Sequence, residues 1–321
     1  MRELPDLGQI ETAARVVYDV MPATPQYCWP LLCKALNAQV WTKHENHTPT
    51  GAFKVRGGLV YFNGLAQGAP QQVAGVVSAT RGNHGQSIAL AAARQGLPSF
   101  IVVPRGNSVE KNAAMRALGA TLIEHGEDFQ AAREHAMALA DEQKLMMVPS
   151  FHPLLIRGVA TYSLELLRAV PDLDVVYVPI GLGSGICGMI AARQALGLRT
   201  RIVGVVSSGA PAYALSFRQR APVAHPVTTE IGDGMACSTP EPQALEWIWQ
   251  HVERVVEVSD DELRSAMRLL FFATHNVAEG AGAAGLAAAL QERERLQGRK
   301  VAIVLSGGNV DSAVFASVLA G

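Results

Sequence analysis

The sequence predicts an α/β fold in which parallel sheets are covered by helices on both faces. Short runs of β-branched residues alternate with longer stretches of helical periodicity along almost all of the 321 residues, and this alternation is typical of strand–helix–strand units. Apolar residues make up 49% of the chain and charged residues 17%, which supplies a large core and excludes a disordered chain. At roughly 150 residues per domain, the length favours two domains, or one large α/β domain with an inset.

The expected strands are short, and helices with a period of about 3.6 residues separate them. We expect strands at residues 39–42, 73–78, 99–103, 121–124, 175–179, 201–206 and 301–305. The clearest helical periodicity covers residues 85–95, 128–141, 154–169, 185–196 and 260–274. Asp260 precedes the apolar stripe of the last of these helices and is expected to cap it.

Charge and cysteine content exclude several classes of protein. Lys plus Arg (27) nearly equals Asp plus Glu (28), for a net charge of −1, so we expect neither a nucleic-acid partner nor an anionic membrane surface. No apolar run reaches the roughly 18 residues that a membrane helix needs. The four cysteines, Cys28, Cys33, Cys187 and Cys237, include no CxxC pair, so we expect a reducing cytoplasm and no disulfide framework.

The turns after the strands carry the most information, because open α/β sheets bind ligands beyond the carboxyl ends of their strands. The first such turn, residues 43–58, places Lys54 between Phe53 and Val55. An apolar setting depresses the pKa of a lysine and frees its amine to form a Schiff base. The alternative is a solvated helix lysine, which is the commoner state of an arbitrary lysine.

The second turn, residues 78–87, is a small polar loop that leads into a helix. Its backbone N–H groups and side chains suit an anion or a ring hydroxyl. The alternative is a helix cap with Asn83 in the left-handed conformation. The third turn, residues 179–188, contains Gly181, Gly183 and Gly185. It matches neither the P-loop nor the GxGxxG dinucleotide pattern, so a monophosphate fits better than a dinucleotide.

The fourth turn, residues 305–311, follows the last expected strand and opens the last helix. Ser306 is expected to point from the strand end into the binding cleft. Taken alone, Ser306 is equally compatible with a plain helix N-cap.

Together and in this order, the four turns resemble the fold-type II family of pyridoxal-phosphate enzymes, in the branch of serine and threonine dehydratases that includes serine racemase. The family patterns TGSFKxRG, SxGNHGQ, GGGG and SGGN correspond here to residues 50–57, 80–86, 181–184 and 306–309, and the family stretch TIADGIA corresponds to residues 229–236. The resemblance runs over nearly the whole chain. It implies two open twisted, mainly parallel sheets with helices on both faces, the tryptophan synthase β-like fold.

The resemblance implies a role for each matching residue. Lys54 would hold pyridoxal 5'-phosphate as a Schiff base and move the proton of the substrate Cα, and Asn83 would hydrogen-bond the ring 3-hydroxyl. Ser306 would hydrogen-bond the ring nitrogen without keeping it protonated, which favours prompt loss of a β-leaving group. The implied cofactor contacts are Phe53, Lys54, Asn83, Gly181, Leu182, Gly183, Ser184, Gly185, Glu279 and Ser306.

The polar loop of the second turn is also expected to bind the substrate, through Thr80, Arg81, Gly82 and His84. Arg81 departs from the racemase branch, where a serine at this position acts on the opposite face of Cα. An arginine stays protonated, with a pKa above about 12, and is a poor base. This departure argues against racemisation and leaves two roles open for Arg81, pairing with a carboxylate or standing as a surface cation.

The divalent-cation site of the family also differs in this sequence. The matching positions are Val206, Ala210 and Ala212, which offer no oxygen ligand for a hard cation. We therefore expect no such metal site.

The resulting functional prediction is a dehydratase that converts a 3-hydroxy amino acid to a 2-oxo acid and ammonia. Serine, threonine and an aryl analogue such as 3-phenylserine stay open as substrates. The alternatives are a racemase, a β-replacement enzyme of the cysteine synthase kind, and a catalytically silent binding module. Residues 1–49 and 141–321 are expected to form a large cofactor-binding domain, residues 50–140 a smaller inserted domain, and the protein a homodimer.

Overall fold

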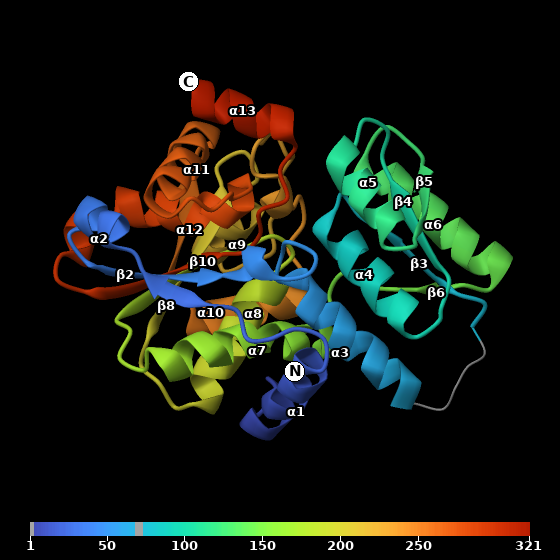
Figure 1. Cartoon of the computed structure of the whole chain (residues 1–321), viewed down its shortest axis with the longest axis horizontal. Helices are drawn as coiled ribbons and strands as arrows, with labels where there is room; N and C mark the ends of the chain where they lie inside the picture. Colours follow the sequence, from blue (N-terminus) through green and yellow to red (C-terminus); the bar gives the residue numbers. More distant parts are fainter. Residues whose placement is uncertain (1–2, 68–72) are drawn as a thin grey trace.

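Two open sheets form the framework of the molecule, and the expected α/β fold class is confirmed. The computed structural model describes residues 3–67 and 73–321. One sheet has six strands in the order β1-β2-β10-β7-β8-β9, and the other has four in the order β5-β4-β3-β6. Figure 1 shows the two sheets beside each other, with α3 running between them.

The chain alternates strands and helices as the sequence predicts. The strands are β1 (Gln26–Cys28), β2 (Gln39–His44), β3 (Val76–Ala79), β4 (Ser99–Val103), β5 (Thr121–Glu124), β6 (Met146–Met147), β7 (Val175–Pro179), β8 (Arg201–Ser207), β9 (Arg254–Val258) and β10 (Lys300–Leu305). The α-helices are α1 (Leu7–Tyr18), α2 (Pro30–Leu36), α3 (Lys54–Gln67), α4 (Asn83–Arg94), α5 (Val109–Ala117), α6 (Phe129–Gln143), α7 (Pro153–Ala169), α8 (Ser184–Ala195), α9 (Ala212–Gln219), α10 (Pro242–His251), α11 (Asp260–Thr274), α12 (Gly280–Gln291) and α13 (Ser312–Ala320). Three 3-10 turns are η1 (Glu45–His47), η2 (Asp233–Met235) and η3 (Arg293–Leu296).

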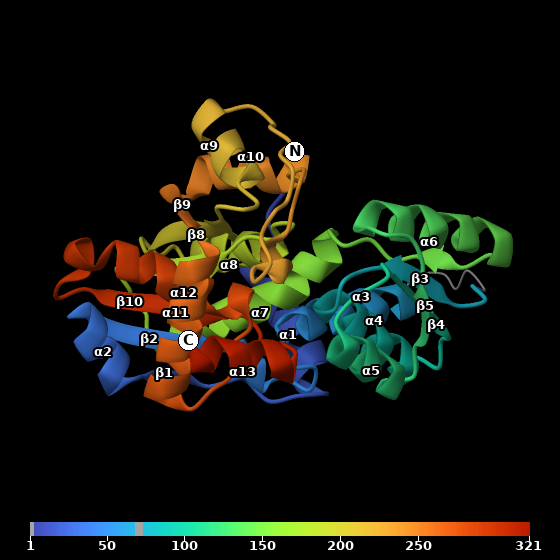
Figure 2. The same ribbon diagram turned by 90° about the horizontal axis from the view of Figure 1, so that it is seen from above.

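The six-stranded sheet is buried on both faces. Strand β1 pairs with β2 in antiparallel fashion, and the other neighbouring strands are parallel. Along β7, Val176 and Val178 join the core formed with α7, α8 and α10, whereas Val175 and Tyr177 join the core formed with α2, α11 and α12. This alternation is what a strand period of two produces. Figure 1 shows these helices on opposite sides of the sheet, and Figure 2 shows the two sheets side by side from above.

The four-stranded sheet is parallel throughout and has the same three-layer construction. Val76 and Ile101 pack in one core with residues of α3, α4 and α5, and Val77 and Val102 pack in a second core with α6. The sheet includes β6, which lies beyond residue 140, the expected end of the inserted domain. The division into domains stays a prediction, and its residues 1–2 and 68–72 lie outside the described residues.

Tertiary contacts move several element boundaries from their expected places. The strand expected at 73–78 covers Val76–Ala79, because its neighbour β4 begins only at Ser99, the partner of Val76. The helix expected at 260–274 has those bounds, but the prediction that Asp260 caps it is wrong. Ser259 is the cap, since its hydroxyl accepts from the Glu262 N–H while the Glu262 carboxylate accepts from the Ser259 N–H.

Candidate active site

The four informative turns meet where the two sheets adjoin. The Phe53 N–H donates to the Ser306 carbonyl at 3.0 Å, which joins the first turn to the fourth. The Lys54 Nζ lies 3.0 Å from the Ser184 Oγ, which joins the first turn to the third. The Asn83 side chain reaches the segment just before α12. The structure therefore brings the predicted cofactor residues together from both sheets.

Lys54 is the first residue of α3. In the described part of the chain, the groups that contact its amine are neutral. Its Nζ contacts the Ser184 hydroxyl and lies 5.0 Å from the centre of the Phe53 ring. Burial lowers the pKa of Lys54 to about 8. Because no carboxylate pairs with it, this amine reaches its neutral, nucleophilic form far more readily than an exposed lysine does.

Two other interior lysines differ from Lys54 in their partners. The Lys43 Nζ donates to Glu165 and to the Thr24 carbonyl, each at 2.6 Å. Burial lowers the pKa of Lys43, and the Glu165 carboxylate counteracts this effect. Burial also opposes the charge on Lys111, but Glu279 and Asp233 outweigh it and raise the pKa of that ammonium. Carboxylates thus occupy the other two amines, which leaves Lys54 as the lysine suited to Schiff-base chemistry.

The glycine-containing third turn forms a backbone cradle at the start of α8. Gly183, the N-cap of α8, has φ +107°, a conformation that L side chains rarely adopt. A Cβ at Gly181 would lie 2.4 Å from the Gly234 carbonyl oxygen, so a side chain does not fit there. The first backbone N–H groups of a helix have no partner within it and favour an anion. The turn therefore suits a phosphate group.

Two aromatic side chains shape this cradle. The Tyr213 hydroxyl donates to the Leu182 carbonyl at 2.9 Å and fixes the middle of the turn. The Phe53 ring lies against Gly185, at 3.5 Å from the place a Cβ would take. Tyr213 lies far from the third turn in sequence, and no local pattern identifies it as part of the site.

Asn83 is the first residue of α4, with Gly82 as the N-cap, and it is not in the left-handed conformation suggested as an alternative. Its amide donates to Glu279 Oε1 at 2.7 Å and its carbonyl accepts from Asn309 at 2.8 Å. Glu279 Oε2 is buried and, among the described residues, has no partner within hydrogen-bond distance, although the Lys111 Nζ lies 3.8 Å away. This oxygen, beside Asn83, can therefore still accept a hydrogen bond from a ligand or a water molecule.

Ser306 lies directly after β10 and is buried. The last helix begins only at Ser312 with Asp311 as its N-cap, so the alternative in which Ser306 caps that helix is wrong. Gly307 forms an isolated antiparallel bridge with Ala52 and lies close to Glu279. These contacts hold Ser306 next to the backbone that precedes Lys54.

A hydrogen bond within the loop stabilises the segment that is expected to bind substrate. The Thr80 hydroxyl accepts from the Gly82 N–H at 3.1 Å. His84 is buried, and its Nε2 has no hydrogen-bond partner among the residues that the structure describes. Burial, followed by the charge of Lys54, lowers the pKa of His84 to about 3. His84 is therefore a neutral imidazole at physiological pH. Arg81 is half exposed, and its guanidinium lies 3.7 Å from the Asp233 carboxylate.

Arg81 belongs to a charged group that we call the cleft cluster, made of Arg81, Lys111, Asp233 and Glu279. The Lys111 Nζ lies 3.1 Å from Asp233 and 3.8 Å from Glu279. Burial raises the pKa of Glu279, and Lys111 counteracts this effect. The cluster lines a cavity of about 480 Å³. Sequence analysis missed Lys111 and Asp233, because their partners come from distant parts of the chain.

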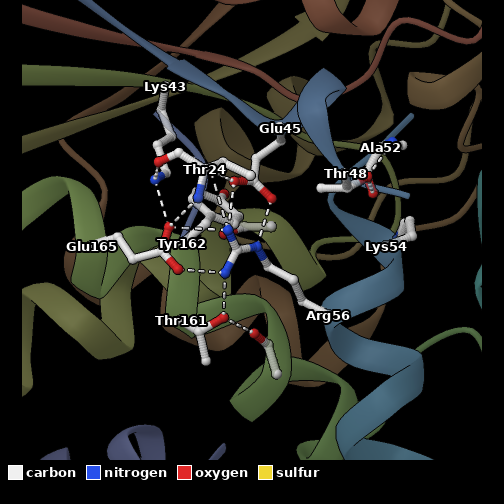
Figure 3. A network of polar contacts seen from close by, with 12 residues as sticks. Thr24, Lys43, Glu45, Thr48, Ala52, Lys54, Arg56, Thr161, Tyr162 and Glu165 are labelled. Carbon is white, nitrogen blue, oxygen red and sulfur yellow. Dashed lines mark hydrogen bonds and ion pairs between the residues drawn. The ribbon is translucent and has the colours of Figure 1, made fainter. Parts of the chain in front are cut away.

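A second charged group, the Arg56 cluster, comprises Thr24, Lys43, Glu45, Arg56 and Glu165 (Figure 3). Arg56 follows Lys54 by two residues in the first turn of α3. The Arg56 guanidinium is fully buried and donates to both Glu45 oxygens, at 2.7 and 3.0 Å. It also donates to both Glu165 oxygens, at 2.7 and 3.0 Å. Burial opposes its charge, but the two carboxylates outweigh burial and raise the pKa of Arg56. The cluster fixes the beginning of α3.

The positions that correspond to the divalent-cation site of the resembled family are buried and apolar. Val206, Ala210 and Ala212 are at most 2% exposed. In the part of the chain that the structure describes, no group of three or more His, Cys, Asp and Glu side chains is arranged to hold a metal ion. Nor does any helix of the described residues combine the length and apolar character that crossing a membrane requires.

The residues at the site fit pyridoxal phosphate. Lys54 offers an amine with a lowered pKa to an aldehyde, and the start of α8 offers unpaired N–H groups to a phosphate. Asn83 and Ser306 would hold the polar positions of the ring from two sides. When bound, this cofactor withdraws electrons from the Cα of an amino acid that is attached through its amino group.

Comparisons with known proteins agree with this fit. The family model described as "Pyridoxal-phosphate dependent enzyme" matches residues 20–307. The L-threonine ammonia-lyase of Thermotoga maritima is 34% identical over 306 residues, which are 95% of this chain and 76% of that protein. The L-threo-3-hydroxyaspartate ammonia-lyase of Saccharomyces cerevisiae is 32% identical over 319 residues, 99% of this chain and 97% of that protein.

A solved structure of maize serine racemase is also similar, with a TM-score of 0.90 and 27% sequence identity, over 99% of this chain and 98% of that one. The family match covers most of the chain, and it includes the turns that carry Lys54, Asn83, Ser184 and Ser306. The chain therefore belongs to the pyridoxal-phosphate dependent enzymes.

Proposed function

We propose that the protein is a dehydratase that removes water from a 3-hydroxy amino acid and releases a 2-oxo acid and ammonia. The observation that carries this proposal is the Lys54 amine, which is held by a neutral hydroxyl, has a pKa of about 8 and lies among the predicted cofactor residues. Relatives named threonine and 3-hydroxyaspartate ammonia-lyases support it.

Lys54 would first bind the cofactor and then act as the base that takes the Cα proton of the substrate. A depressed pKa suits this second role, because a general base works best when its pKa is close to the working pH. Burial beside Phe53 and Ser184 keeps the amine in that range without a charged partner. Ser306 would contact the ring nitrogen through a neutral hydroxyl, which favours elimination over long-lived charge at Cα.

The loop at residues 80–84 would bind the substrate carboxylate through the backbone N–H groups at the start of α4. Arg81 would reinforce the positive potential there while staying paired with Asp233. The buried and neutral His84 would contribute shape rather than charge.

The substrate panel that tests the proposal contains serine, threonine, threo-3-hydroxyaspartate and threo-3-phenylserine, assayed for 2-oxo acid and ammonia. We expect 2-oxo acid and ammonia to be released from at least one of the four compounds, and we expect threonine or serine to be among the substrates. An aryl substrate stays part of the proposal because the turns at residues 44–54, 80–85 and 181–185 differ from the family patterns. Release from none of the four would overturn the dehydratase assignment.

Three alternatives to a dehydratase remain, and each has a distinct experimental signature. A racemase would interconvert enantiomers of a substrate without releasing ammonia, and the protonated Arg81 argues against the second base this needs. A β-replacement enzyme would require a thiol or another nucleophile as co-substrate. A silent binding module would be purified without the visible absorbance of a lysine-bound cofactor.

The protein is further proposed to be a homodimer in a reducing compartment such as the cytoplasm. Helix α13 is almost wholly apolar, yet Val318 is its only buried residue, and Val314 and Leu319 are exposed. A second copy of the chain would cover this helix. All four cysteines are free, as a reducing compartment requires. Sedimentation analysis of wild type and Leu319→Glu tests the interface, with a shift to monomer expected in the variant.

A further inference from the structure

Two cysteines that are five positions apart in the sequence have their sulfur atoms in contact. Cys28 ends β1 and Cys33 lies in α2, and their Sγ atoms are 3.4 Å apart. A disulfide bond is about 2.05 Å long, so the two sulfurs need to approach by only about 1.4 Å to bond. Both side chains are partly exposed to solvent.

The surroundings give the two sulfurs different chemical characters. The Cys33 Sγ accepts a hydrogen bond from the Val40 N–H at 3.3 Å, which ties this sulfur to the backbone of β2. Burial and the neighbouring thiol raise the pKa of Cys28 to about 11, so this sulfur stays protonated at neutral pH. Cys33 is therefore the better first nucleophile, and Cys28 is placed to react with it afterwards.

The other two cysteines lack such an arrangement and provide an internal comparison. Cys187 is fully buried in α8, and burial raises the pKa of its thiol. The Cys237 thiol donates to the Thr239 carbonyl, and burial raises its pKa to about 11. Neither has another cysteine among its recorded contacts.

We propose that Cys28 and Cys33 form a reversible redox site, in which a disulfide such as oxidised glutathione converts the pair to an intramolecular disulfide. The Cys33 thiolate attacks one sulfur of oxidised glutathione, forms a mixed disulfide and releases one glutathione thiolate. The Cys28 thiol loses its proton to solvent and attacks the Cys33 sulfur, which releases the second glutathione. Two protein thiols are oxidised, and one glutathione disulfide is reduced.

The experiment treats the purified holoenzyme with oxidised glutathione and follows thiol number, intact mass and disulfide-linked peptides. In wild type we expect two of the four thiols to be lost, the mass to fall by two hydrogen atoms, and one linked peptide to join Cys28 and Cys33. Dithiothreitol is expected to restore all four thiols. Four titratable thiols after treatment, or a stable glutathione adduct on wild type, would overturn the proposal.

Two serine variants assign the order of attack. Cys28→Ser is expected to accumulate glutathione on Cys33, because the second thiol is missing. Cys33→Ser is expected to retain its three thiols over the same time, because burial raises the pKa of the Cys28 thiol and keeps it protonated at neutral pH. Equal rates of adduct formation in both variants would contradict the assigned order. Cys237→Ser is the matched control, and it should form the Cys28–Cys33 disulfide at the wild-type rate.

Discussion

The Arg56 cluster and the cleft cluster contain similar residues, yet they differ in how completely those residues are paired. Every donor of the Arg56 guanidinium meets an oxygen of Glu45, Glu165, Thr24 or Thr161 at 2.7–3.1 Å. In the cleft cluster, Glu279 Oε2 is buried with no hydrogen-bond partner in the described part of the chain and only a 3.8 Å approach of the Lys111 Nζ, and Arg81 is half exposed. In the Arg56 cluster, which we call closed, every guanidinium donor is satisfied. In the cleft cluster, one buried acceptor can still take a hydrogen bond from a ligand or water.

This difference separates a stabilising role from a functional one. A buried ion network with all its hydrogen bonds satisfied fixes the elements that it joins, and breaking it is costly. Buried polar atoms without partners are rare in folded proteins, and an ordered water or a ligand commonly satisfies them. Lys54 stands two positions before Arg56 in α3, so we assign support of its backbone to the Arg56 cluster and contact with ligands to the cleft cluster.

The largest expected effect comes from Lys54 itself. Lys54→Ala removes both the Schiff-base amine and the Cα base, so turnover should fall by at least about 10³-fold. Thermal stability should be kept, because no carboxylate loses its partner. Ammonia release and thermal unfolding measure the two effects, and turnover close to that of wild type would show that another lysine carries the cofactor.

Breaking the closed cluster should affect stability most. Arg56→Met leaves Glu45 and Glu165 buried without their cation, which should cost about 3–5 kcal/mol of unfolding free energy. Arg105→Met is the control, since Arg105 pairs with Glu127 at an exposed site and should cost about 1 kcal/mol or less. Urea unfolding measures both variants. Equal losses would contradict the stabilising role assigned to the Arg56 cluster.

Breaking the cleft cluster should affect activity more than stability. Lys111→Met should lower kcat/KM by about tenfold, the effect of losing one hydrogen bond to a charged group. Without Lys111 the pKa of Glu279 rises further, so Glu279 stays protonated to higher pH and the acidic limb of the pH–rate profile moves to higher pH. Arg81→Met, at an exposed position, should move that limb less. An unchanged profile in Lys111→Met would separate Glu279 from catalysis.

Ser306→Asp should change the product ratio by a smaller amount. A carboxylate beside the ring nitrogen raises the pKa of that nitrogen and keeps it protonated, which favours return of a proton to Cα over loss of the hydroxyl. Deuterium from D₂O should therefore appear in recovered substrate while 2-oxo acid release slows. Because Ser306 does not cap α13, unchanged exchange and unchanged release would remove it from the cofactor site.

The smallest expected effect follows removal of divalent cations. EDTA should leave activity and melting temperature nearly unchanged, because Val206, Ala210 and Ala212 cannot ligate a hard cation. Ligands that bind only the native state raise its stability. A clear rise in melting temperature on adding Mg²⁺ would therefore reveal a cation site elsewhere in the protein.

The sequence predicted the fold class and the turns of the site because both depend on local patterns. Strand–helix alternation and four short motifs placed Lys54, Asn83, Ser184 and Ser306 before any contact was known. The sequence could not predict the clusters around them. Arg56 meets Glu165 across 109 positions and Lys111 meets Asp233 across 122, so these pairs exist only once the two sheets are assembled.

Which lysine holds the cofactor tests the account most directly. The holoenzyme is reduced with borohydride, which fixes a Schiff base permanently, and is then digested and mapped by mass spectrometry. Lys54 has a neutral partner and a pKa of about 8, whereas Lys43 and Lys111 are paired with carboxylates. We expect a single labelled peptide that contains Lys54, and a label on Lys43 or Lys111 would contradict the assignment of Lys54 as the cofactor lysine.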